Sequence, residues 1–175
     1  MAKMTSAYAN KLIKQLEEEK SFWTTKEADS QVYQVAMNEE PLIPDYDYVE
    51  VSTKIAEIDE KICKIKHAVN LHNVTNTVRV EEEEVTIDMI LVKMAQLNKR
   101  KAVLDIMRKR QPKTRNNENS FGGFSSRNNA VPEYRYINYD LELVKQEYER
   151  ISEKIMKMQM QLDIFNQTHE FEVEL

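Results

Sequence analysis

Positively charged and aromatic side chains are concentrated between Lys99 and Tyr139, in a chain that is acidic elsewhere. Guanidinium groups bind phosphate through paired hydrogen bonds, aromatic rings stack on bases, and asparagine amides both donate and accept hydrogen bonds. This mixture predicts a site for an anionic aromatic ligand such as a nucleotide. The cations are Lys99, Arg100, Lys101, Arg108, Lys109, Arg110, Lys113, Arg115, Arg127 and Arg135. We expect ligand contacts from Arg115, Phe121, Phe124, Arg127, Tyr134, Arg135 and Tyr136.

The same cations also have a purely structural interpretation. Arg108, Lys109 and Arg110 close a predicted helix, where positive charge opposes the negative end of the helix dipole. The aromatic rings can anchor the following loop on the helices. The formal net charge of -5 argues against general nucleic-acid binding, because the net field repels phosphate. The ligand and the structural interpretation both remain open on the sequence alone.

Residue groups typical of catalysis or metal binding are absent from the sequence. His67 and His72 are five positions apart, whereas a zinc-binding pair on a helix uses a spacing of three or four. Gly122 and Gly123 are the two glycines of the chain, too few for a phosphate-binding or dinucleotide-binding loop. Cys63, on a predicted helix, is expected to pack rather than react. We therefore predict a protein that is not an enzyme and that uses no cofactor and no metal ion.

Long helices must position the basic segment. Apolar residues at alternating spacings of three and four predict a helix over 140–167 with one apolar stripe. A helix over 46–72 has the same spacing and is a candidate partner, with His72 continuing its apolar stripe. The two stripes are Leu141, Val144, Tyr148, Ile151, Ile155, Met158, Leu162 and Phe165, and Tyr48, Val51, Ile55, Ile58, Ile62, Ile65, Val69 and His72. The predicted fold is mainly α, an antiparallel bundle or coiled coil of about four long helices in a single domain over 1–175.

The remaining elements follow from capping residues, prolines and alternation. We expect an extended crossing segment over 30–44. Pro41 and Pro44 exclude a helix there, because proline lacks an amide donor and biases its predecessor toward extended geometry. We expect the three short strands of the chain to form one sheet, in which acids of the C-terminal tail face Arg79 or Arg135. The expected elements are helices over 5–29, 46–72, 87–110 and 140–167, an extended segment over 30–44, a hairpin over 77–86, a long loop with a short strand over 111–139, and a strand over 168–175.

The last helix carries a second apolar set on another face, formed by Met156, Met160 and Ile164. One partner helix cannot bury both faces. Either the intrachain bundle surrounds this helix, or the second face is an oligomer contact, as exposed apolar patches on soluble proteins often are. We favour self-association, because a thin bundle of long helices leaves much apolar surface uncovered. Met156, Met160 and Ile164 are therefore the expected homo-oligomer interface.

The sequence favours a cytoplasmic protein. Its N-terminus lacks the apolar core of a signal peptide, and charged residues interrupt every apolar run before it reaches membrane-spanning length. Cys63 is the single cysteine, so no internal disulfide can form, which suits a reducing compartment.

Several helix-joint residues carry a resemblance to a known family. Glu39, Glu40 and Pro41 precede a long helix that continues through Lys64-Ile65-Lys66 to Asn70 and Asn76, and the last helix ends Phe165-Asn166-Gln167-Thr168 before an acidic strand. In this order of elements the chain resembles the septicolysin-like family of small bacterial helical proteins. The resemblance implies a helical, oligomeric coiled-coil fold in a family whose biochemical role is not established. Its name suggests a pore-forming toxin, which this sequence does not support.

Three functional hypotheses follow in order of preference. The first is a non-enzymatic, self-associating helical protein whose arginine, asparagine and aromatic loop binds or sequesters an anionic ligand such as a nucleotide. The second is a purely structural or protein-partner-binding coiled coil without a small ligand. The third is a membrane-active protein.

Overall fold

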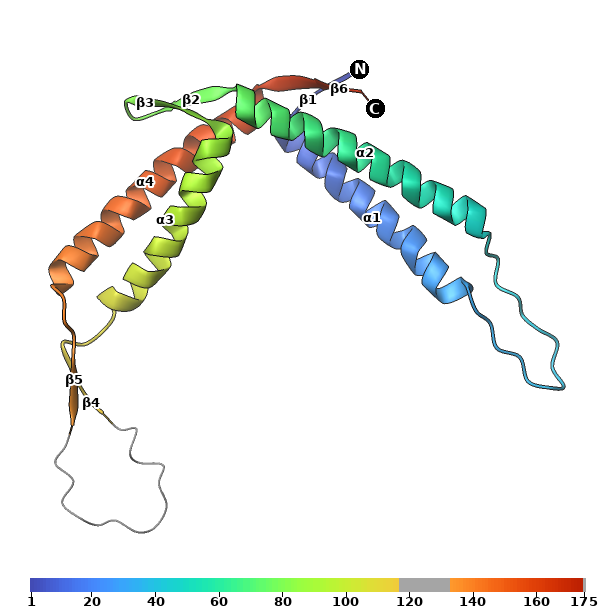
Figure 1. Ribbon diagram of the computed structural model, residues 1–175, viewed down its shortest axis with the longest axis horizontal. Helices are drawn as coiled ribbons and strands as arrows, with labels where there is room; N and C mark the ends of the chain where they lie inside the picture. The colour runs from blue at the N-terminus through green and yellow to red at the C-terminus, as the bar shows by residue number, and fades with distance from the viewer. Residues whose placement is uncertain (117–132, 175) are drawn as a thin grey trace, which may run out of the picture. The chain divides into compact units, whose positions relative to one another are not determined.

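The computed structural model describes residues 1–116 and 133–174, which are mainly helical with a few short strands, as predicted. The elements are β1 (Ala2–Thr5), α1 (Ser6–Ser30), α2 (Tyr48–Thr75), β2 (Thr77–Val80), β3 (Glu83–Thr86), α3 (Ile87–Arg108), β4 (Lys113–Arg115), β5 (Tyr134–Tyr136), α4 (Leu141–Thr168) and β6 (Glu170–Val173). Four long helices are described; strands precede α1, follow α4 and lie between α2 and α3 and between α3 and α4, whereas α1 and α2 are joined by a segment without a strand (Figure 1). The helix bounds agree with the predicted ones to within three residues, and 31–47 is free of helix, as Pro41 and Pro44 require.

Each helix begins at a side chain that accepts hydrogen bonds from free amides of the first turn. Asp47 Oδ1 accepts from the amides of Val49 and Glu50 at 2.8 and 3.2 Å. Asp140 Oδ1 does the same for the first turn of α4, while Thr5 and Thr86 cap α1 and α3 through their hydroxyls. Such a cap stabilises a helix by about 1 kcal/mol relative to alanine.

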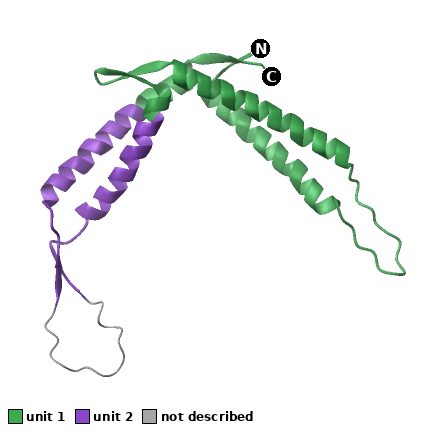
Figure 2. Ribbon diagram, viewed as in Figure 1, with its two compact units in different colours: residues 1–90, 160–175 green, residues 91–159 purple. Residues whose placement is uncertain are grey.

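The chain divides into two compact units (Figure 2). Unit 1 comprises Met1–Ile90 and Met160–Leu175, and unit 2 comprises Leu91–Gln159. In unit 1, α1 and α2 pack as an antiparallel pair through Leu16, Ile58 and Ile62. Ala9 is fully buried in the same core, where its small side chain lets other elements approach closely.

The terminal strands cover one part of the unit 1 core. β1 pairs with β6 in antiparallel register, with Met4 opposite Phe171 and Ala2 opposite Val173. Met4 and Val173 turn inward and join the apolar cluster of α1 and α2. The N- and C-terminal segments thus lie side by side.

The prediction of one three-stranded sheet was wrong. The described strands form three separate two-stranded sheets, β1–β6, β2–β3 and β4–β5. The acids of the tail therefore do not face Arg79 or Arg135: Glu172 lies 3.8 Å from Lys3, whereas Arg79 pairs across from Glu84 and Arg135 across from Thr114. The alternating pattern fixes which face of a strand is buried but does not select its partner.

In unit 2, α3 is the partner of α4. Leu104 of α3 is buried against Val144 and Ile151 of α4, with Tyr148 and Ile155 packed around them. The predicted candidate partner, the helix over 46–72, instead packs along α1. Both helices have the same apolar period, so the period alone cannot distinguish between the two pairings. None of the helices in the described residues has the length and the apolar composition of a bilayer-spanning segment.

Candidate functional site

We call the C-terminal end of α3 together with the β4–β5 hairpin the basic end of unit 2. The amide of Arg110 donates to the carbonyl of Met107 at 3.1 Å, which closes the last turn, and Pro112 then prevents further helix. The amide of Ile137 donates to the carbonyl of Pro112 at 3.3 Å. This bond holds β5 beside β4 directly below the end of the helix.

The two faces of the β4–β5 hairpin carry different side chains. Lys113 lies opposite Tyr136, Thr114 opposite Arg135, and Arg115 opposite Tyr134. Side chains alternate between faces, so the two tyrosines share a face with Lys113. Its ammonium nitrogen lies 4.1 Å from the ring centroid of Tyr134 and 5.5 Å from that of Tyr136, a cation–π arrangement that stabilises the exposed rings. Thr114 and Arg135 face the other way.

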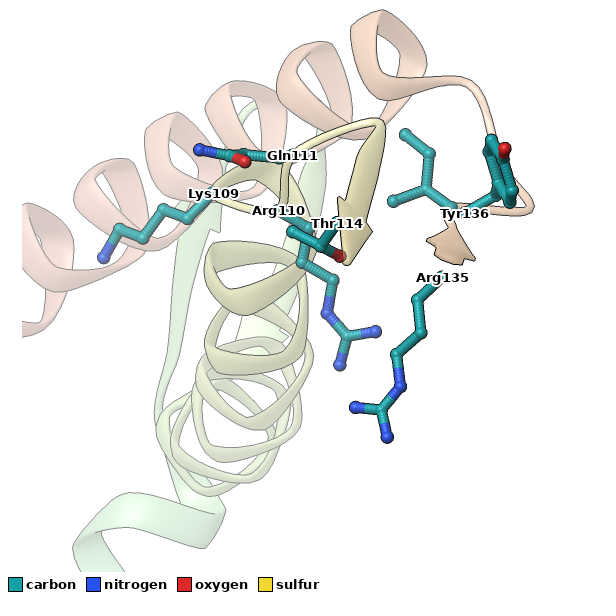
Figure 3. Close-up of a pocket in the computed structure, with 7 residues that line it drawn as sticks. Lys109, Arg110, Gln111, Thr114, Arg135 and Tyr136 are labelled. Atoms are coloured by element: carbon teal, nitrogen blue, oxygen red, sulfur yellow. The ribbon is translucent and has the colours of Figure 1, made fainter. Parts of the chain in front are cut away.

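A pocket of about 390 Å³ lies between the end of α3 and the hairpin. Figure 3 shows the side chains of Arg110 and Arg135 extending in the same direction, with the hydroxyl of Thr114 near the base of Arg110. An anion in this pocket would meet two planar guanidinium groups, each able to donate two parallel hydrogen bonds. The pocket is lined by Lys109, Arg110, Gln111, Thr114, Arg135, Tyr136 and Ile137.

Asp105 binds two other cations: Lys109, which lines the pocket, and Arg108, which is not part of the lining. Its carboxylate contacts the ammonium of Lys109, and one of its oxygens lies 2.6 Å from the guanidinium of Arg108. Lys109 and then Arg108 lower the pKa of the Asp105 carboxyl through these hydrogen bonds. Arg108 also stacks on Tyr148, with Cζ 4.0 Å from the ring centroid. Arg108 therefore has a structural role, as the second interpretation of the cations expects. Arg110, in contrast, has no carboxylate partner among the described residues.

The structure brings some of the proposed ligand residues together. Arg135 and Tyr136 line the pocket, while Arg115 and Tyr134 form a cross-strand pair on the tyrosine-bearing face of the hairpin. The other three expected residues, Phe121, Phe124 and Arg127, lie outside the described part of the chain.

Sequence reasoning omitted several residues of the pocket from the ligand set, namely Lys109, Arg110, Gln111, Thr114 and Ile137. Lys109 and Arg110 are among the cations named from the sequence, and the structural interpretation assigns them to the helix dipole. Pro112 biases Gln111 away from helical geometry, and the structure ends α3 at Arg108, so Arg110 lies beyond the helix. The alternation of Thr114 with Lys113 and Arg115 was the available signal, because it places Thr114 on the face opposite to theirs.

The second apolar set of α4 is exposed. Met156, Met160 and Ile164 expose 57%, 57% and 54% of their surface, whereas Met158 exposes 2%. Consecutive residues of a helix turn by about 100°, so Met160 lies on the side of α4 opposite to Met158. The described chain therefore does not cover this face of α4, in contrast to the alternative in which the bundle surrounds the helix.

Histidine and cysteine form no metal site in the described ranges, where no group of three metal-binding side chains occurs. His72 is buried, as expected from its place on the apolar stripe. Cys63 is exposed, so the expectation that it packs was wrong. Its neighbour Ile62 turns into the α1–α2 core and leaves Cys63 on the outer side of α2.

Comparison with known proteins supports the fold alone. No family model matches the sequence, and no curated protein matches it. The fold is similar to the crystal structure of a functionally unknown conserved protein from Corynebacterium diphtheriae, with a TM-score of 0.68 and 13% sequence identity. The match covers 98% of this chain and 100% of the other, so the similarity is not confined to one of the two units.

Proposed function

We propose that this chain is a non-enzymatic, self-associating helical protein that binds an anionic ligand at the β4–β5 end of unit 2. The observation that carries the ligand proposal is the pocket in which Arg110 and Arg135 extend together beside Thr114. Two arginines and a hydroxyl suit a phosphate group, because each phosphate oxygen can accept several hydrogen bonds.

The adjacent tyrosine favours a ligand that carries an aromatic group as well. Tyr136 lines the pocket and exposes 65% of its surface. A base that stacks on an aromatic side chain gains about 1–3 kcal/mol. The ring of Tyr136 lies on the hairpin face that carries Lys113, opposite to Arg135, so a nucleotide with its phosphates at the arginines would bring its base to this ring around the edge of the hairpin. Inorganic phosphate lacks this second contact.

The exposed face of α4 supports the self-association proposal. Met156, Met160 and Ile164 form a continuous apolar row on a helix that already has a buried stripe. Burying such side chains in an interface releases about 25 cal/mol for each Å² removed from water. The same row favours the second candidate function, a structural coiled coil that binds a protein partner and no small ligand. A cytoplasmic location and membership of the septicolysin-like family both remain predictions.

A thermal-shift screen tests the ligand proposal. The purified protein is heated with each common nucleoside mono-, di- and triphosphate and with inorganic phosphate. We expect a nucleotide to raise the melting temperature, since a ligand that binds the folded state alone stabilises it by mass action. If no nucleotide or phosphate changes the melting temperature, and the protein still forms oligomers, the second candidate function is favoured.

A further inference from the structure

The loop between α1 and α2, residues 31–47, exposes a large apolar surface. Met37 exposes 100% of its surface and Leu42 93%, although both are residues that usually lie inside a protein. Val32, Tyr33, Val35 and Ile43 are exposed as well. Exposed apolar surface of this extent marks an interaction site more often than a chance arrangement.

The same loop is acidic. It contains Glu39, Glu40, Asp45 and Asp47, and the sequence has no lysine, arginine or histidine from residue 27 to residue 53. The loop is also anchored near its end, where the hydroxyl of Tyr46 donates to Glu27 at 3.2 Å and Asp47 caps α2. The partner of this loop should therefore combine positive charge with apolar surface.

The basic end of unit 2 has that complementary chemistry. Between residues 106 and 116 the chain holds five cations and no carboxylate, and two of these cations, Arg108 and Lys109, are paired with the neighbouring Asp105. The elements that carry these cations also carry exposed apolar and aromatic side chains: Val103 and Ile106 of α3 and Tyr136 of β5 expose 47%, 60% and 65% of their surface. Arg110 and Arg115 have no carboxylate partner among the described residues. An acidic apolar loop would neutralise these charges and cover the rings.

We propose that the loop over residues 31–47 of one copy docks on the basic end of unit 2 of a second copy. This inference rests on the proposed self-association and adds a second contact to the one expected at Met156, Met160 and Ile164. Each chain carries both surfaces, so two copies can make the contact twice in a two-fold dimer, or a series of copies can repeat it head to tail. A membrane with anionic lipids does not suit the loop, because four carboxylates repel its surface.

Charge reversal in the loop tests the docking. Glu39→Lys combined with Glu40→Lys places two cations opposite the basic end without altering a described side-chain contact. We expect the dissociation constant of the oligomer, measured by light scattering over a dilution series, to rise about tenfold or more. The matched control is Glu18→Lys combined with Glu19→Lys, which makes the same charge change on the exposed side of α1 and should leave the constant unchanged.

A charge swap separates the docking from a general loss of folding. Arg110→Glu combined with Arg115→Glu should also weaken self-association, while an equimolar mixture of this variant with the Glu39→Lys, Glu40→Lys variant should form heteromeric complexes. Recovery of the wild-type mass in the mixture supports the proposal. A loop variant that assembles like the wild type, or a mixture that stays dissociated, overturns it.

The same experiment distinguishes failure of the inference from failure of the proposed function. A wild-type protein that is monomeric at every concentration overturns both the self-association and the docking. A wild-type oligomer that is insensitive to both double substitutions overturns the docking alone, and leaves Met156, Met160 and Ile164 as the interface. Arg110 belongs both to the pocket and to the docking surface, so nucleotide binding is compared between the wild type and the Glu39→Lys, Glu40→Lys variant, which leaves the pocket residues unchanged.

Discussion

The imidazole of His72 stacks on the ring of Phe165, with the ring centroids 4.9 Å apart and an interplanar angle of 27°. His169 stacks on Phe165 as well, at 4.4 Å. Asn76 Nδ2 lies 3.0 Å from Nδ1 of His72, a contact in which the amide donates to a neutral ring that carries its proton on Nε2, and this Nε2 is buried without a hydrogen-bond partner among the described residues. This arrangement holds the ends of α2 and α4 together around a neutral histidine.

Acid should weaken unit 1 through His72. Burial, and secondarily the charge of His169, lowers the pKa of His72 below its ordinary value of about 6.5. As the pH falls below that value, the unfolded state binds a proton before the folded state does, so the free energy of unfolding decreases. Above that pH the imidazole of His72 is neutral in both the folded and the unfolded state, so its protonation no longer lowers the free energy of unfolding. We expect a lower melting temperature at pH 5.5 than at pH 7.5.

The matched variant for this prediction is His72→Phe, which keeps a stacked ring and removes the titration. Its melting temperature should fall less between the two pH values than that of the wild type. Equal decreases in both proteins would show that other groups, such as the carboxylates, cause the acid sensitivity.

Leu104→Ala should destabilise the protein by about 2–5 kcal/mol, because it leaves a cavity in the core between α3 and α4. Leu104 exposes 1% of its surface and packs against Val144 and Ile151. Its neighbour Val103 exposes 47%, and Val103→Ala should change the stability by about 0.5 kcal/mol or less. Urea unfolding measures both values, and equal effects of the two substitutions would contradict the assigned core.

Met160→Lys should reduce the oligomeric mass and leave the fold intact. The side chain lies on the exposed face of α4, so a charge there removes apolar contact from an interface and none from the core. Gln161→Lys, an exposed substitution on a different side of the helix, is the control. Light scattering gives the mass and circular dichroism the helix content. An unchanged mass for Met160→Lys would remove this face from the interface.

The helices could be predicted from the sequence because local chemistry determines them. Asp47 and Asp140 cap α2 and α4 because each carboxylate accepts hydrogen bonds from the amides of the first turn that follows it. The apolar period identifies the buried side of α4 independently of which element covers that side. The pairing of elements depends on residues far apart in the chain. β1 is too short to show alternation, so the strand that pairs with Phe171 and Val173 had no signal of its own.

The candidate site was predictable in composition more than in geometry. Arg135 and Tyr136 follow from the concentration of cations and rings, but their position beside Arg110 depends on the turn at Pro112 and on the register of β4 with β5. Short strands specify their register weakly, because few side chains are buried.

The affinity for a nucleoside triphosphate tests the central claim most directly. Calorimetric titration of ATP into the wild-type protein should give saturable binding, and Arg110→Ala combined with Arg135→Ala should weaken it about tenfold or more, since each arginine donates charge-assisted hydrogen bonds to phosphate. Lys11→Ala combined with Lys61→Ala changes the net charge equally on exposed positions of unit 1, and should bind like the wild type. Equal affinities for all three proteins, or no binding to the wild type, would contradict the claim that this pocket binds nucleotides.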